Sequence, residues 1–242
     1  MVYYYDSTFD GLMTAIFDIY SAKDNEAIIQ PTTENVPFTL YGSHNVITNV
    51  AKSDRVQKGL RKLGPRVLEQ LYKAWLSHDD GIENIMLSVI RIGLSSGKDP
   101  FEQRTHEAVC KLDSIQRKVS REAERMLQFV RFKKLAENLY AADIEPHFDV
   151  LELIGEHFHS RFPQSNFIIR NLRHYKAILS TPAGWHITSL PKHNPPLPKD
   201  AEYENLWQTY FKIIANESRI NQKLQRQFVP LKYRKHLTEF QI

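Results

Sequence analysis

A short segment of the chain, Glu156–Pro163, combines acidic, imidazole and guanidinium side chains in the sequence EHFHSRFP. On a helix, His157 and Arg161 lie one turn apart and share a face. Such a pair can grip a phosphate, and the imidazole can act as a general acid or base beside a carboxylate. His157 and Glu156 are therefore the candidate catalytic residues. The alternative is structural, since aromatic residues anchor helix ends and basic side chains there oppose the helix dipole favourably.

Basic side chains are concentrated in two segments of the second half of the chain. Residues 117–134 contain seven Lys or Arg against two Glu, and residues 219–236 contain six Lys or Arg and no acidic residue. Such clustering favours a polyanionic partner, whereas the alternative is a solvated helix face. The candidate nucleic-acid contacts are Arg117, Arg121, Arg125, Arg131, Arg161, Arg219, Asn221, Lys223, Arg226, Lys232 and Arg234.

Aromatic and basic residues also alternate in Phe129–Phe132, which has the sequence FVRF and is followed by Lys133 and Lys134. Aromatic rings interleaved with arginine can stack on bases and neutralise phosphates. The alternative places both phenylalanines in the core. In either case Arg131 is expected to contact nucleic acid or a buried acid.

Metal and radical chemistry find little support in the residue types present. Cys110 is the single cysteine, so neither an internal disulfide nor the cysteine set of a radical-SAM iron–sulfur cluster is possible. Glu102, His106 and Cys110 are spaced four apart on an expected helix, but three such residues arise often by chance and no second ligand pair accompanies them. We therefore expect no metal and no cofactor.

The overall composition is that of a globular protein. The chain has 242 residues, of which 42% are hydrophobic and 25% charged, so it can form one large domain or two small ones. Its N-terminus lacks the pattern of a secretory signal, and no apolar run approaches the roughly 20 residues that span a bilayer. The sequence therefore predicts a cytoplasmic protein with no membrane partner.

The elements that must position these side chains are mostly helical. Apolar residues recur at helical spacing in residues 9–22, 53–63, 65–77, 82–94 and 150–162, and in a long helix that begins just after Pro100 and includes Phe129–Phe132. Strand-like runs lie at residues 2–5, 166–170, 174–179 and 185–190, whereas residues 23–45 read as an irregular connection. The sequence therefore predicts an α+β fold, mostly helical, with a small antiparallel β-sheet.

Prolines at positions 191, 195, 196 and 198 interrupt the regular patterns and predict a stiff linker over residues 191–199. Residues 1–190 then form a helical α+β core that includes the sheet. Residues 200–242 are expected to form a C-terminal helical segment that packs back on this core.

Four stretches, taken in order, resemble a known family. They are Tyr5–Leu12, Phe129–Phe132, His157–Pro163, and Leu206–Phe211 followed by Arg219–Asn221. Their order and spacing are similar to those of a bacterial family of DNA repair or DNA metabolism proteins. The family carries a domain-of-unknown-function label and is typically encoded beside a radical-SAM protein of DNA repair or modification. The resemblance implies a role near DNA, but it supplies no reaction.

Three hypotheses for function follow. In the first, the protein binds DNA and acts in DNA repair or DNA metabolism with a radical-SAM partner. In the second, it is a hydrolase acting on DNA, glycosylase-like or nuclease-like, that uses His157. In the third, it is a non-catalytic scaffold that binds proteins, and its basic faces are merely solvated. The sequence leaves open whether the chain is itself an enzyme.

Overall fold

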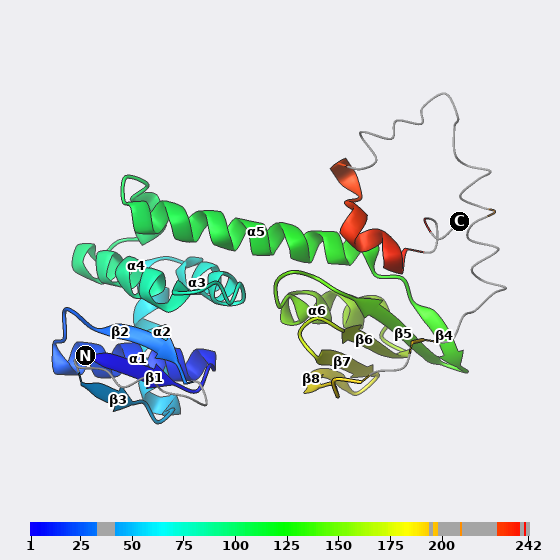
Figure 1. Ribbon diagram of the computed structural model, residues 1–242, viewed down its shortest axis with the longest axis horizontal. Helices are drawn as coiled ribbons and strands as arrows, with labels where there is room; N and C mark the ends of the chain where they lie inside the picture. Colours follow the sequence, from blue (N-terminus) through cyan, green and yellow to red (C-terminus); the bar gives the residue numbers. More distant parts are fainter. Residues whose placement is uncertain (33–41, 194–195, 198–208, 210–226, 238–239, 241–242) are drawn as a thin grey trace. The chain divides into compact units, whose positions relative to one another are not determined.

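A computed structural model describes residues 1–32, 42–193, 196–197, 209, 227–237 and 240, and it shows an α+β protein with two sheets (Figure 1). The chain divides into two compact units, Met1–Ser120 (unit 1) and Arg121–Ile242 (unit 2). This division falls inside the long helix α5 (Glu107–Phe129). Within the described ranges, no helix has both the length and the apolar character needed to cross a bilayer.

Unit 1 contains a three-stranded parallel sheet with β1 (Val2–Tyr5) at its centre, between β2 (Ile28–Pro31) and β3 (Ser43–Asn45). All four residues of β1 are buried, which explains the continuous apolar run that predicted this strand. The prediction that residues 23–45 form an irregular connection is wrong, because β2 and β3 lie there. Both strands are short, and β3 is polar throughout, so backbone pairing with β1 defines them better than any side-chain pattern does.

Helix α1 (Phe9–Ala22) follows β1 and buries the apolar residues of its inner face against the sheet. Its N-cap is Thr8, whose Oγ1 accepts a hydrogen bond from the Gly11 N–H at 2.9 Å. Asp6 accepts hydrogen bonds from the Thr8 N–H and hydroxyl through Oδ1, which orients the cap.

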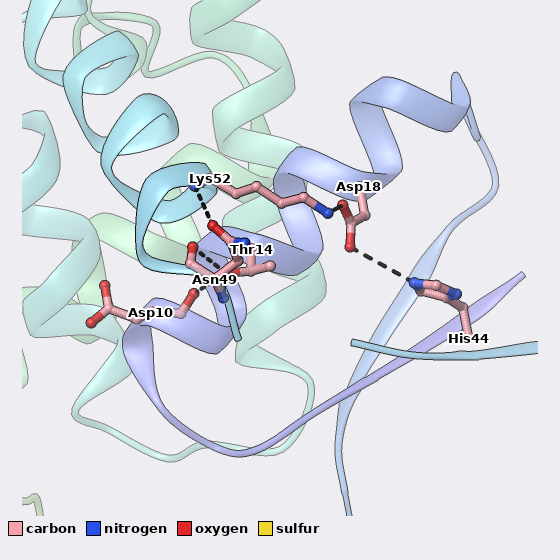
Figure 2. Close-up of polar contacts among 6 residues, drawn as sticks. All are labelled: Asp10, Thr14, Asp18, His44, Asn49 and Lys52. Carbon is pink, nitrogen blue, oxygen red and sulfur yellow. Dashed lines mark hydrogen bonds and ion pairs between the residues drawn. The ribbon is translucent and has the colours of Figure 1, made fainter. Parts of the chain in front are cut away.

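Helices α2 (Val50–Leu63), α3 (Val67–Trp75) and α4 (Ile82–Ser96) contribute to the core of unit 1, as does the first part of α5. Asn49 caps α2 by accepting from the Lys52 N–H, so this helix begins three residues before the predicted start. The Thr14 hydroxyl and the Asn49 backbone tie α1 to the start of α2 (Figure 2). Lys52 also forms an ion pair with Asp18 of α1, with 2.6 Å between Nζ and Oδ1.

The predicted long helix is interrupted near its start. A short 3-10 helix, η1 (Pro100–Glu102), precedes α5, because the Asp99 carboxylate accepts from the Phe101 N–H and closes a separate turn. Helix α5 begins only at Glu107 and ends at Phe129, three residues before the predicted segment FVRF is complete. Glu102 and Cys110 therefore do not share one helix face as the sequence spacing suggested.

Unit 2 contains a five-stranded sheet in the order β4-β5-β6-β7-β8. Its strands are β4 (Lys133–Ala136), β5 (Leu139–Ile144), β6 (Asn166–Asn171), β7 (Lys176–Thr181) and β8 (Gly184–Ser189). The predicted hairpin and third strand are confirmed as β6, β7 and β8, which pair antiparallel. Strand β4 was not predicted.

The prediction of an antiparallel sheet is only partly right, since β5 and β6 pair in parallel. The cause is helix α6 (Leu151–Arg161), which lies between these two strands in the sequence. A strand–helix–strand connection returns the chain in the same direction, and α6 covers the sheet. At the contact, a Cβ on Gly155 would lie 2.5 Å from the Trp185 ring of β8, so glycine permits this close approach.

Most of the predicted C-terminal segment, residues 200–242, and part of the predicted linker, residues 191–199, lie outside the described residues. The described part near the C-terminus contains the 3-10 helix η3 (Leu231–His236). Its Tyr233 is buried, which gives η3 an anchor within unit 2.

Candidate functional site

An open aromatic pocket lies in unit 2 (the aromatic pocket). It has a volume of about 270 Å³ and is lined by Phe132, Tyr140, Phe162, Ser165 and Phe167. Phe132 directly precedes β4, Tyr140 lies in β5, and Phe162 directly follows α6. Ser165 lies in the turn before β6, and Phe167 lies in β6. Because β5 and β6 pair in parallel with Tyr140 opposite Phe167, two of the lining side chains lie on adjacent strands.

Edge-to-face contacts fix the rings of the aromatic pocket. The Phe132 ring centroid lies 5.6 Å from that of Phe162 and 5.4 Å from that of Phe167, with interplanar angles of 75° and 69°. Phe158, buried beneath them, contacts Phe132 in the same way. Phe162 is 37% exposed, so one ring of this cluster is available to a planar partner from solvent.

Basic residues follow or precede the lining aromatics in the chain. Arg161 comes directly before Phe162, is exposed, and makes no ion pair or side-chain hydrogen bond within the described residues. Lys133 and Lys134 come directly after Phe132 at the start of the edge strand β4. Cationic residues therefore flank two of the lining aromatic residues in the chain, and aromatic rings with basic residues nearby suit an unstacked base and its phosphate.

The candidate catalytic pair does not form a pair in the structure. Glu156 is exposed and accepts hydrogen bonds from Trp185 Nε1 at 3.0 Å and from the Ser160 hydroxyl at 3.1 Å. These bonds, the one from Trp185 first, lower the pKa of Glu156. His157 is also exposed, and its ring packs edge-on against Phe158. Glu156 thus has a role in joining α6 to β8, and nothing orients it toward His157.

The histidine of this helix that does have a polar partner is His159. Its Nδ1 lies 3.0 Å from the hydroxyl oxygen of Ser180, a buried residue of β7. Sequence reasoning missed this contact because the two residues belong to different elements. Burial of Ser180 makes a structural role for the pair the simplest interpretation.

Glu122 of α5 is the centre of a second polar cluster in unit 2. Its Oε1 accepts hydrogen bonds from the Tyr233 hydroxyl at 2.5 Å and from Lys232 Nζ at 2.9 Å, and its Oε2 accepts from the Phe148 N–H at 2.7 Å. Burial raises the pKa of Glu122, but the hydrogen bonds from Tyr233, Lys232 and the backbone outweigh burial and lower it. The buried carboxylate is thus kept ionised and fixes η3 to α5.

Several of the predicted nucleic-acid contacts have protein partners. Arg117 pairs with Asp113 at 3.0 Å, and Lys232 pairs with Glu122. Arg131 donates through Nη1 to the Gln128 carbonyl at 2.7 Å, which closes the C-terminal end of α5. Arg234 donates through Nε to the Val229 carbonyl. These four side chains therefore have identifiable structural roles.

The remaining predicted contacts fall into two groups. Arg121 and Arg125 of α5, like Arg161, have no ion pair or side-chain hydrogen bond within the part of the chain that the structure describes. Four further candidates lie outside the described residues: Arg219, Asn221, Lys223 and Arg226. The structure brings the residue after Arg161, Phe162, together with Phe132 of the FVRF segment, because both rings line the aromatic pocket.

A serine motif and the possible metal ligands can also be placed in the fold. Residues 93–97, GLSSG, have the spacing of a nucleophile elbow, but they end helix α4 and Ser95 donates its hydroxyl proton to the Ile92 carbonyl. A true elbow needs a strand before the serine. In the described ranges, no group of three His, Cys, Asp or Glu residues is placed to hold a metal ion.

The fold and the aromatic pocket define an α+β protein whose second unit presents an open, ring-lined site on a mixed sheet. The profile of DUF4130, a domain of unknown function, matches residues 80–239, about two thirds of the chain. The chain therefore belongs to the DUF4130 family, and the matched range includes the whole aromatic pocket. A comparison with curated proteins gave no match.

Proposed function

We propose that this protein binds DNA and acts in DNA repair or DNA metabolism together with a radical-SAM protein. The observation that carries the proposal is the aromatic pocket, with the partly exposed Phe162 ring next in the chain to Arg161, which has no ion pair among the described residues. A planar base can stack on the ring while the guanidinium contacts its phosphate. The pocket thus suits a base that is already unstacked from a duplex. The protein is proposed to act in the cytoplasm.

The radical-SAM partner in this proposal rests on the resemblance of the four motif segments. The chain has one cysteine, so the iron–sulfur cluster of such chemistry must belong to another protein. The DNA-hydrolase alternative has less support, because Glu156 is engaged with Trp185 and Ser160 rather than with His157. The scaffold alternative predicts no salt-dependent binding of nucleic acid at all.

The proposal is tested by titrating the full chain into fluorescent single- and double-stranded DNA over a salt series. We expect binding that weakens steeply with salt, because released counterions drive contacts to phosphate. Phe162→Ala should weaken binding about ten-fold, the usual effect of losing one stacked base. The matched control is Tyr175→Ala, which removes an exposed aromatic ring of unit 2 outside the pocket.

If the Phe162→Ala and Tyr175→Ala proteins bind DNA with equal affinity, the aromatic pocket does not contact DNA. Absence of DNA binding by the unmodified chain at low salt would contradict direct DNA binding itself. Thermal unfolding of each variant checks that the fold is retained.

A further inference from the structure

Unit 1 contains a second hollow, which lies wholly outside the range matched by the DUF4130 family. This groove has a volume of about 570 Å³ and lies among the first turn of α1, the second half of α2, and α3. The lining residues that matter here are Phe9, Asp10, Gln57, Arg61 and Tyr72. The function proposed above makes no use of this groove.

One wall of the groove is aromatic and rigid. The Phe9 and Tyr72 rings meet edge to face, with centroids 5.0 Å apart and an interplanar angle of 90°. Trp75 supports both rings from behind, stacking on Tyr72 and contacting Phe9. Rings fixed in this way can receive a planar group without losing further conformational freedom.

Hydrogen bonds fix the carboxylate of Asp10 in the groove. The Ser53 hydroxyl and the Gln57 amide both donate to Oδ1 of Asp10, at 2.6 and 3.2 Å. The other carboxylate oxygen, Oδ2, accepts no hydrogen bond within the described residues. Figure 2 shows the Asp10 carboxylate turned away from the Asp18–Lys52 ion pair and from the Thr14–Asn49 contact. Asp10 therefore offers one fixed acceptor for an N–H donor.

Arg61 supplies the positive charge of the groove. Its guanidinium is exposed and donates through Nη2 to Gln57 Oε1 at 3.3 Å, but it has no carboxylate partner in the described part of the chain. The surrounding segment is strongly basic, since residues 52–66 contain six Lys or Arg and a single acid, Asp54. The acid Glu69 also lines the groove, but its carboxylate is paired with Lys73, with 2.6 Å between Oε1 and Nζ. Arg61 is therefore the lining cation that remains available to an anion.

Together these features match one class of ligand, a planar ring with N–H donors joined to an anionic group. We infer that the groove binds a nucleotide, with the base against Phe9 and Tyr72, a base N–H on Asp10 Oδ2, and the phosphate on Arg61. The nucleotide can be free or part of single-stranded DNA, and in the second case the inference rests on the proposed DNA binding. The groove then gives unit 1 a nucleotide contact separate from the aromatic pocket of unit 2.

The test compares the full chain with its Arg61→Gln variant, using two probes: deoxyadenosine monophosphate and a labelled single strand of about 15 nucleotides. The control is Arg104→Gln, which removes an exposed arginine of unit 1 outside the groove. We expect Arg61→Gln, but not the control, to weaken mononucleotide binding roughly ten-fold. With the single strand, the slope of log affinity against log salt should fall by about 0.7, the loss of one phosphate contact.

The outcomes separate the two proposals. If Arg61→Gln matches the control with both probes while Phe162→Ala still weakens DNA binding, the groove inference is overturned and the proposed function stands. If no DNA binds but the mononucleotide binds and depends on Arg61, the groove takes free nucleotides and the proposed function fails. If neither probe binds the unmodified chain, both are overturned. Rescue by Arg61→Lys would show that the charge at this position acts on the ligand.

Discussion

Glu83 in unit 1 and Glu122 in unit 2 are both buried glutamates that accept a hydrogen bond from a tyrosine hydroxyl. Tyr5 of β1 donates to Glu83 of α4 at 2.8 Å, and in the described residues it is the one side-chain donor to that carboxyl group. Glu122 has three donors, two of them on or beside η3. The two buried carboxyl groups therefore differ in their partners. Glu83, next to the core of unit 1, accepts from one described side chain, whereas Glu122, which anchors η3, accepts from three groups, one of them the Lys232 ammonium.

The largest effect should come from removing the better-connected carboxylate. Glu122→Ala leaves the Tyr233 hydroxyl, the Phe148 N–H and the Lys232 ammonium without their acceptor, so we expect the free energy of unfolding to fall by about 3 kcal/mol. Urea denaturation measures this change in the free energy of unfolding. Glu124→Ala, an exposed position two residues on, should change it by less than about 0.5 kcal/mol. Equal small losses for both variants would show that the Glu122 cluster does not stabilise unit 2.

Removing each tyrosine hydroxyl sharpens the comparison. Tyr5→Phe deprives Glu83 of its one described side-chain donor, so we expect a loss of about 2 kcal/mol. Tyr233→Phe leaves Glu122 with Lys232 and the Phe148 N–H, so about 1 kcal/mol is expected. The two unfolding free energies can be compared directly in urea. If Tyr233→Phe costs more than Tyr5→Phe, the additional donors do not compensate for the missing hydroxyl.

A smaller effect is expected from pH. Because the pKa of Glu122 is lowered in the folded protein, its contribution to stability is fully present above its ordinary value of 4.5 and is lost as the pH falls through the folded-state pKa. Unfolding measured between pH 7 and pH 3 should therefore show less acid destabilisation in Glu122→Gln than in the unmodified chain. Identical pH profiles would mean that other carboxyl groups account for the acid sensitivity.

Local patterns predicted the elements that local interactions determine. The apolar spacing of α1 and α4, the buried run of β1, and the β6–β7 hairpin all appear where the sequence placed them. Strands β2 and β3 escaped prediction because they are only four and three residues long, too short for a side-chain pattern to stand out. Their position depends on backbone pairing with β1, which no local pattern reveals.

The candidate site shows the same limit. The sequence motifs pointed to the segments that contain Phe132 and Phe162, but not to Tyr140, Ser165 or Phe167. These join the pocket through the parallel register of β5 and β6, which only the α6 connection sets. The signal that could have indicated these lining residues is the aromatic residue near the start of each strand, Tyr140 in β5 and Phe167 in β6. Likewise, nothing in the sequence around Lys232 indicated that its charge is committed to Glu122.

The contact between Glu122 and Tyr233 spans 111 positions of sequence. During synthesis on the ribosome, the N-terminal part of a chain emerges first, and domains tend to fold as they appear. Helix α5 is therefore exposed in the nascent chain long before η3 has been translated, and its carboxylate remains solvated until then. The Glu122 cluster can therefore form only after η3 has emerged, and until then this face of α5 is uncovered and accessible to chaperones.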